Sequence, residues 1–254
     1  GGSGERGAEG SWRSTSDRLR PDGEELGPAR GVTSAAAGRI NPTLIWTGVE
    51  YVVAWQDWRH RVSAPDNFEV YFTFLDREGL EIGDDIRLTR DPDNSEAPSL
   101  ALNAVDGEIG IAFVDGRTGN EQIWFAIVDG AGTTLVEPFR ISDTRTDAFS
   151  VEVAWADGAY LLAWQEETEA GDFDVMGARI ERPGVRVDGP TVIAGGEAWA
   201  RRPRMLVNGD EVLIGYSDDR SGVYDIYAAL YDTRFGRLGD DIVVTRGPVD
   251  SVYG

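Results

Sequence analysis

Apolar residues in this chain gather in short runs that recur in the same order four times. The clearest run reads EYVVAWQ at 50–56, and its counterparts begin at Glu108, Ala159 and Glu211. Each run is rich in Val, Ile, Leu, Tyr, Phe or Trp and is bounded by Gly, Pro, Asp or Asn, which is typical of β-strands. Helical periodicity does not develop along the chain. The pattern therefore predicts an all-β protein.

The next run of each repeat ends at an acidic residue and gives the period. These ends lie 53, 52 and 51 residues apart, at Asp76, Asp129, Glu181 and Asp232. A further run keeps the same spacing and ends at Thr89, Ser142, Ala194 and Thr245. With an inner strand near 43–46, one repeat contains four short strands, which matches a β-propeller blade. The continuously apolar runs suit sheets that neighbouring blades cover on both faces.

The repeats set the domain boundaries that we expect. Four complete blades are predicted at about 42–97, 98–150, 151–202 and 203–245, preceded by a partial blade at 11–33. The Gly-rich segment 1–10 has the composition of a flexible linker, so one propeller domain spans 11–254. Three forms remain open: about five blades with the N-terminal strands paired to the last blade, a fragment of a larger ring, or a ring completed by another chain. We favour the first.

Two of the predicted loops carry a recognisable motif. The stronger copy is SDDRSGVYDIY at 217–227 and the weaker one is VDGRTGNEQIW at 114–124. Over 42–245 the chain resembles bacterial β-propeller repeats of the TolB type, in which a strand runs into D-x-R-x-G-x-x-D-I-Y. The first repeat departs by a longer loop after Arg59, and the third has no Arg in 166–176. The resemblance implies the propeller fold and leaves the function open, because propellers host unrelated activities.

Composition excludes several classes of function. Asp and Glu number 45 against 24 basic residues, all of them Arg, and the formal net charge is -21. So acidic a chain would repel nucleic acid. Without Lys or Cys, and with one His, the chain lacks Schiff-base lysines, thiol nucleophiles, disulfides and Cys-type zinc sites. No apolar run is long enough for a membrane-spanning helix.

A carboxylate follows the second strand of every repeat, at Asp57, Asp115, Glu166 and Asp218. Propeller geometry places these four loops on one face, where a ring of carboxylates could bind Ca²⁺, which takes ~6 to 8 oxygen ligands, or a cationic partner group. The alternative is local: each Asp accepts hydrogen bonds from its own loop and pairs with the Arg two positions later, at Arg59, Arg117 and Arg220. No EF-hand calcium loop is present.

Two further loops hold candidate ligand-binding residues: Trp58, Arg59 and His60 in the first repeat, and Trp199, Arg201 and Arg202 in the fourth. His60 is the one imidazole and is either a ligand contact or a solvated side chain. The absence of a G-x-S-x-G motif from the sequence argues against a Ser-His-Asp triad. The two Trp residues lie outside the strands and could stack on sugars. The arginines of the basic cluster at 200–204, next to Trp199, could bind a carboxylate or sulfate group, or neutralise nearby acidic residues.

Two functions fit these observations. The first is a non-enzymatic binding or scaffold propeller that recognises a protein or glycan through its loop face, outside the cell, on its surface or in the periplasm. It rests on the regular repeats and on the lack of an evident catalytic group. The alternative is a carbohydrate-active enzyme that uses paired carboxylates near the central channel. Two loop-face carboxyl groups at a pocket, one with a raised pKa, would favour the enzyme.

Overall fold

The computed structural model describes residues 2–6, 12–16, 20, 22–25, 27, 30–31, 38–59, 67–181, 186–196 and 198–246. Its main body is four antiparallel sheets of four strands, each built from consecutive strands. The first sheet contains β4 (Arg39–Trp46), β5 (Tyr51–Asp57), β6 (Glu69–Leu75) and β7 (Glu81–Arg87). The second contains β8 (Ser95–Asn103), β9 (Glu108–Asp115), β10 (Gln122–Val128) and β11 (Thr134–Arg140).

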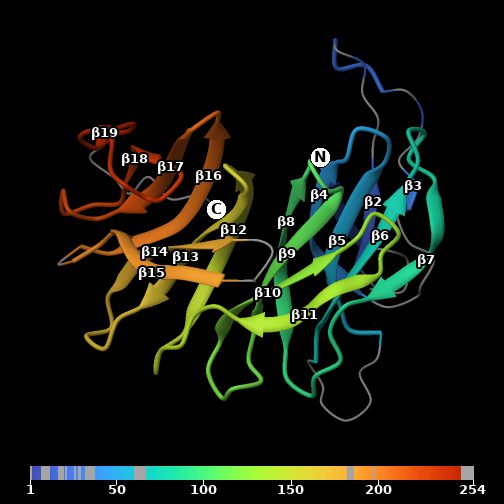
Figure 1. The fold of residues 1–254 in the computed structure, drawn as a ribbon, viewed down its shortest axis with the longest axis horizontal. Helices are drawn as coiled ribbons and strands as arrows, with labels where there is room; N and C mark the ends of the chain where they lie inside the picture. The colour runs from blue at the N-terminus through green and yellow to red at the C-terminus, as the bar shows by residue number, and fades with distance from the viewer. Residues whose placement is uncertain are drawn as a thin grey trace.

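The other two complete sheets repeat this arrangement. The third contains β12 (Ala148–Ala156), β13 (Ala159–Glu167), β14 (Phe173–Glu181) and β15 (Arg186–Ala194). The fourth contains β16 (Ala200–Asn208), β17 (Glu211–Asp218), β18 (Asp225–Asp232) and β19 (Ile242–Val243). The sheets are arranged around a common centre, with β4, β8, β12 and β16 innermost (Figure 1). The predicted all-β propeller is confirmed, and no helix long and apolar enough to span a membrane occurs in the described residues.

Apolar side chains from adjacent sheets form the core. Phe125 of β10 and Tyr160 of β13 are fully buried, with ring centroids 5.0 Å apart, and both belong to the cluster between the second and third sheets. Gly110 of β9 leaves room for this contact, because a Cβ there would lie 2.5 Å from the Tyr160 ring. Similar clusters join the first sheet to the second and the third to the fourth. Burial on both faces explains why the strand runs are continuously apolar.

The N-terminal strands form a sheet of their own. It contains β1 (Gly2–Arg6), β2 (Trp12–Ser16) and β3 (Arg30–Gly31), in that order. One expectation is corrected here. The segment 1–10 contains a strand that pairs with β2, whereas its composition had suggested a linker. The N-terminal strands also pair with one another and lie beside β4, and the described residues contain no pairing between them and the last sheet.

Every innermost strand of the four complete sheets has a bulge near its start. The bulged residues have left-handed φ values of 53°, 49°, 54° and 51°, at Asn41, Ala97, Ser150 and Arg202. The strand register shifts at the same four places. A left-handed φ is unfavourable for residues other than glycine, so a conformation that recurs four times must be held by its surroundings. Gln56 supplies part of this support, since its Oε1 accepts hydrogen bonds from Asn41 Nδ2 (2.8 Å) and the Ala97 N–H (2.9 Å).

Candidate functional site

The bulges surround a polar pocket at the centre of the sheets. A cavity of about 320 Å³ is lined by the bulged residues of β4, β8 and β12 and by the residues just after them. A second cavity of about 520 Å³ lies against the fourth sheet and shares Ser150 and Arg204 with the first. The residue two positions after the bulge is polar in all four blades: Thr43, Ser99, Glu152 and Arg204. The fold therefore converts one repeated strand position into the polar lining of a pocket.

Glu152 is the carboxyl group in the smaller cavity. Its side chain is 26% exposed and forms an ion pair with Arg204 Nη1 from the next blade. Burial raises the pKa of Glu152, and the charge and hydrogen bond of Arg204 oppose this without cancelling it. The pocket thus presents a carboxyl group that gains a proton more readily than an ordinary Glu.

A second group of carboxyl side chains lies on the loop face. Glu121 precedes β10. Its backbone N–H donates to Asp147 Oδ1 at 3.0 Å, and its backbone carbonyl oxygen accepts a hydrogen bond from the Ala148 N–H at 2.8 Å. Burial, followed by the negative charges of Glu96 and Asp147, raises the pKa of Glu121 to about 7. Glu96 accepts a hydrogen bond from Gln56 Nε2 at 3.3 Å and directly precedes pocket residues Ala97 and Pro98. A carboxyl group half protonated near neutral pH therefore lies within electrostatic reach of two others.

In the D-x-R loops each Asp binds the Arg two positions later, which is the local alternative considered from the sequence. Asp115 is fully buried and accepts hydrogen bonds from the Arg117 backbone N–H (2.9 Å), Nε (2.7 Å) and Nη2 (2.5 Å). The loops of Asp57 and Asp218 repeat this arrangement with Arg59 and Arg220. In the third repeat, Glu166 accepts a hydrogen bond from Trp164 Nε1 at 3.0 Å.

This pairing bears on the calcium site considered from the sequence. The carboxylates of Asp57, Asp115 and Asp218 already bind guanidinium groups in their own loops. The described residues contain no group of three or more His, Cys, Asp or Glu side chains that could hold a metal ion. The described residues therefore do not bring these four side chains together, and each is bound within its own loop.

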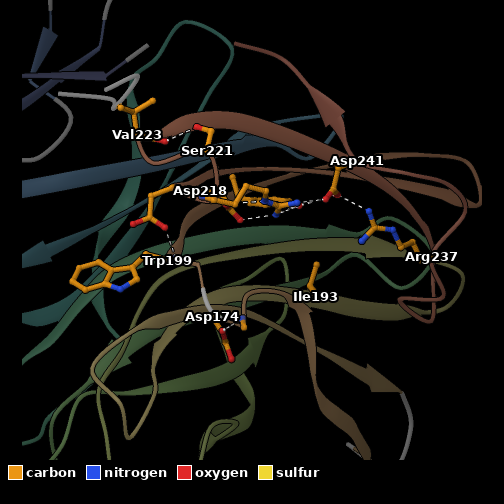
Figure 2. A network of polar contacts seen from close by, with 12 residues as sticks. Asp174, Ile193, Trp199, Asp218, Ser221, Val223, Arg237 and Asp241 are labelled. Atoms are coloured by element: carbon orange, nitrogen blue, oxygen red, sulfur yellow. Dashed lines mark hydrogen bonds and ion pairs between the residues drawn. The ribbon is translucent and has the colours of Figure 1, made fainter. Parts of the chain in front are cut away.

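The loop of the fourth blade is tied together by a network of polar contacts. Asp241 accepts hydrogen bonds from Tyr216 (2.9 Å) and Arg237 (2.5 Å) and forms an ion pair with Arg220 of the D-x-R loop (Figure 2). Burial acts to raise the pKa of Asp241, but the hydrogen bonds from Arg220, Tyr216 and Arg237 outweigh it and lower the pKa. Because these donors come from separate segments, the network fixes the outer edge of the blade.

The candidate ligand-binding residues fall in different places. Trp58 packs against Gly38, where a Cβ would lie 1.9 Å from the indole, and against Phe68 at a centroid distance of 5.2 Å. Arg59 bridges Asp57 and Asp85. His60 lies outside the described residues. The first loop therefore uses its Trp and Arg for internal contacts.

The candidates of the fourth repeat lie around the start of β16. Trp199 donates its indole N–H to Asp172 Oδ1 (2.5 Å) and its backbone N–H to Asp219 Oδ1 (2.8 Å). Arg202 is an exposed bulge residue that lines the larger cavity, and its backbone N–H binds Gln165 Oε1 at 3.1 Å. The guanidinium of Arg201 lies over the Trp199 ring at 4.1 Å.

The carboxyl residues Glu96, Glu121 and Glu152 were missed from the sequence. In a chain with 45 acidic residues, no single Glu stands out. For Glu152 a signal existed: aligning the repeats places it with Thr43, Ser99 and Arg204 at a polar position within an apolar strand. For Glu121 no such signal existed, because its neighbours Glu96 and Asp147 come from other segments.

The fold and pocket define a β-propeller with a polar centre and a loop face rich in carboxyl groups. No family model matches the sequence, and neither does any curated protein. Among solved structures, the Hadza microbial sialidase Hz136 superimposes with a TM-score of 0.60 at 13% identity, covering 94% of this chain and 55% of the sialidase. The catalytic domain of the GH62 α-L-arabinofuranosidase of Coprinopsis cinerea has a TM-score of 0.52 at 8% identity and coverages of 82% and 68%.

A third structure comes from work on the GH130 family of mannoside phosphorylases, which contains glycoside hydrolases that target β-1,2 mannosidic linkages. It has a TM-score of 0.52 at 13% identity and covers 79% of this chain and 69% of its own. At identities this low, the superpositions demonstrate a shared fold only. The similar structures nevertheless correct two expectations. The similar structures are propellers of the glycoside hydrolase type, whereas the sequence had suggested the TolB type, and they favour the carbohydrate-active alternative over a non-enzymatic scaffold.

Proposed function

We propose that this chain is a carbohydrate-active propeller enzyme that hydrolyses a glycosidic bond with two carboxyl groups on its loop face. The observation that carries the proposal is Glu121, whose pKa of about 7 results from burial and from the charges of Glu96 and Asp147. Glycoside hydrolysis needs one carboxyl group that still holds its proton and one that has lost it. The fold shared with solved glycosidases supports the same assignment.

Glu121 is the general acid of the proposed reaction and Glu96 the second carboxylate. They lie at the ends of β10 and β8, which are separated by β9. Neighbouring strands are about 4.8 Å apart, so the two backbones are separated by roughly 10 Å, and the charge of Glu96 acts on the pKa of Glu121. Paired carboxyl groups in glycosidases act across about 5 to 9.5 Å. Glu121 protonates the leaving oxygen, and Glu96 either activates water or attacks the sugar itself.

Glu152 and Arg204 have a positioning role in this proposal. Their ion pair crosses from β12 to β16 at the wall of the central pocket. Charged acceptors and donors bind sugar hydroxyls more strongly than neutral ones do. The pair therefore orients a glycan at the mouth of the pocket. A glycan substrate also agrees with a location outside the cell, on its surface or in the periplasm, which we retain as part of the proposal.

The test is the release of reducing sugar from arabinan, β-1,2-mannan and sialylated oligosaccharides. Glu121→Gln should lower kcat about 10²- to 10⁴-fold, the range expected for loss of a general acid. Glu78→Gln, on the exposed turn after β6, is the matched control and should retain full activity. Full activity of Glu121→Gln, or no hydrolysis of any of these glycans by the wild-type protein, would contradict the proposal.

The pH dependence gives a second readout. Wild-type activity should fall as the pH rises through about 7, because Glu121 then loses the proton that it donates. Folding stability should change in the same direction. Glu121 releases its proton near pH 4.5 in the unfolded chain and near pH 7 in the folded chain. The contribution of Glu121 to the free energy of unfolding should therefore fall as the pH rises from 4.5 to 7 and stay constant above pH 7. Glu121→Gln should remove this decline, which thermal unfolding at several pH values would measure.

A further inference from the structure

Arg201 differs from the arginines of the D-x-R loops. Arg59, Arg117 and Arg220 each bind a buried Asp two residues earlier. The side chain of Arg201 makes no hydrogen bond and no ion pair with any described residue, and its Nε is buried without a partner. Its side chain is part-buried, unlike the exposed arginines Arg90 and Arg145. In a chain of net charge -21, a sheltered cation without a carboxylate partner needs an explanation.

Three aromatic rings hold this guanidinium in place. Its Cζ lies 4.1 Å from the ring centroid of Trp199, 4.6 Å from that of Phe173 and 5.3 Å from that of Tyr224. The rings come from the starts of β14, β16 and β18, so two blades build the cage. Cation–π contacts act on the flat faces of the guanidinium. They satisfy its charge in part and leave its in-plane N–H donors without an acceptor.

The cage is itself rigid. Hydrogen bonds from both nitrogens of Trp199 to Asp172 and Asp219 fix the indole, and Phe173 packs edge-on against it at a centroid distance of 5.7 Å and an angle of 69°. Figure 2 shows Trp199 and the hydrogen bond of its backbone N–H. Arg201 is thus held in advance in one orientation, which reduces the entropy lost when a ligand binds. A planar fork of N–H donors matches the oxyanions of carboxylate and sulfate groups.

We propose that Arg201, held by Trp199, Phe173 and Tyr224, binds the oxyanion of an acidic glycan at the loop face. This inference rests on the proposed carbohydrate-active function and specifies its substrate class. The shared chemistry is a carboxylate or sulfate group on a sugar. Of the two roles considered for the arginines of 200–204, Arg204 neutralises a protein carboxylate, whereas Arg201 leaves its donors for a ligand.

The test is calorimetric binding of three probes: an oligogalacturonate, a sulfated galactan oligosaccharide and a neutral arabino-oligosaccharide. Arg201→Gln should weaken binding of an acidic probe at least tenfold and leave any binding of the neutral probe unchanged. Arg201→Lys should give an intermediate loss, because it keeps the charge without the fork. Arg90→Gln makes the same change of charge at an exposed arginine before β8 and should have no effect. The two acidic probes separate a carboxylate ligand from a sulfate ligand.

Several outcomes would overturn the inference: no binding of either acidic probe to the wild-type protein, equal losses for Arg201→Gln and Arg90→Gln, or an equal loss for the neutral probe. A large fall in thermal midpoint for both Arg201→Gln and Arg201→Lys would assign Arg201 a structural role instead. The result is separable from the proposed reaction, since binding is measured without turnover. If Glu121→Gln stays active while Arg201→Gln loses the acidic probe, the acid assignment fails and the anion site stands.

Discussion

Replacing Asp115 with Asn tests the account of the D-x-R loops. The buried carboxylate accepts hydrogen bonds from Ser95 Oγ (2.7 Å) and from three N–H groups of Arg117. Asn keeps one acceptor oxygen but turns an amide N–H₂ toward these donors and removes the charge that Arg117 faces. The side chain of Arg117 is only 23% exposed, and its next carboxylate, Asp91, is 3.5 Å away.

The magnitude follows from this geometry. Breaking a buried ion pair by removing one partner costs about 3 to 5 kcal/mol. The partial exposure of Arg117 and the presence of Asp91 place Asp115→Asn at the lower end, about 3 kcal/mol. For a chain of this size, each kcal/mol lowers the thermal midpoint by about 2 to 4 °C, so we expect a fall of roughly 6 to 12 °C. Differential scanning calorimetry would measure it.

The third repeat supplies the control. Glu166 occupies the equivalent position but accepts one hydrogen bond, from Trp164 Nε1, which the amide oxygen of Gln can also accept. Glu166→Gln should therefore cost no more than about 1 kcal/mol. A double variant, Asp115→Asn with Arg117→Met, should be more stable than Asp115→Asn alone, because no unpaired guanidinium remains. The reasoning is refuted if Asp115→Asn lowers the midpoint no more than Glu166→Gln does.

Two further predictions concern the pocket and the metal question. Arg204→Met removes the charge that opposes the raised pKa of Glu152, so the pKa of Glu152 should rise further. The variant should therefore lose more stability than the wild type as the pH increases from 4.5 to 8. Thermal unfolding across this range would measure the difference between the two proteins, and a difference that does not change with pH would contradict the prediction. Arg59, Arg117 and Arg220 already bind the Asp residues of their loops. The thermal midpoint measured in millimolar Ca²⁺ should therefore be no higher than the midpoint measured with a chelator. A clearly higher midpoint in Ca²⁺ would support a calcium site.

Several parts of the site were accessible to sequence reasoning because they are local. The D-x-R pairs join residues two positions apart, and the alternation of strands and turns already placed them in one kind of loop. The pairing of Asp with Arg was considered there beside a calcium ring. Arg201 and Trp199 were also chosen as candidates, although their contact with each other and with Phe173 was not foreseen.

The period of the repeats, the class of the strands and the four-bladed body were determined by the sequence alone. These properties depend on which residues are apolar over stretches shorter than ten residues, and burial on both faces leaves that pattern in every blade. Only the tertiary structure decided which carboxyl group keeps its proton and which arginine lacks a partner. The pKa of Glu121 depends on burial and on charges from Glu96 and Asp147, and the isolation of Arg201 depends on rings from two blades. Both are set by distances between segments that are remote along the chain, and no local pattern encodes those distances.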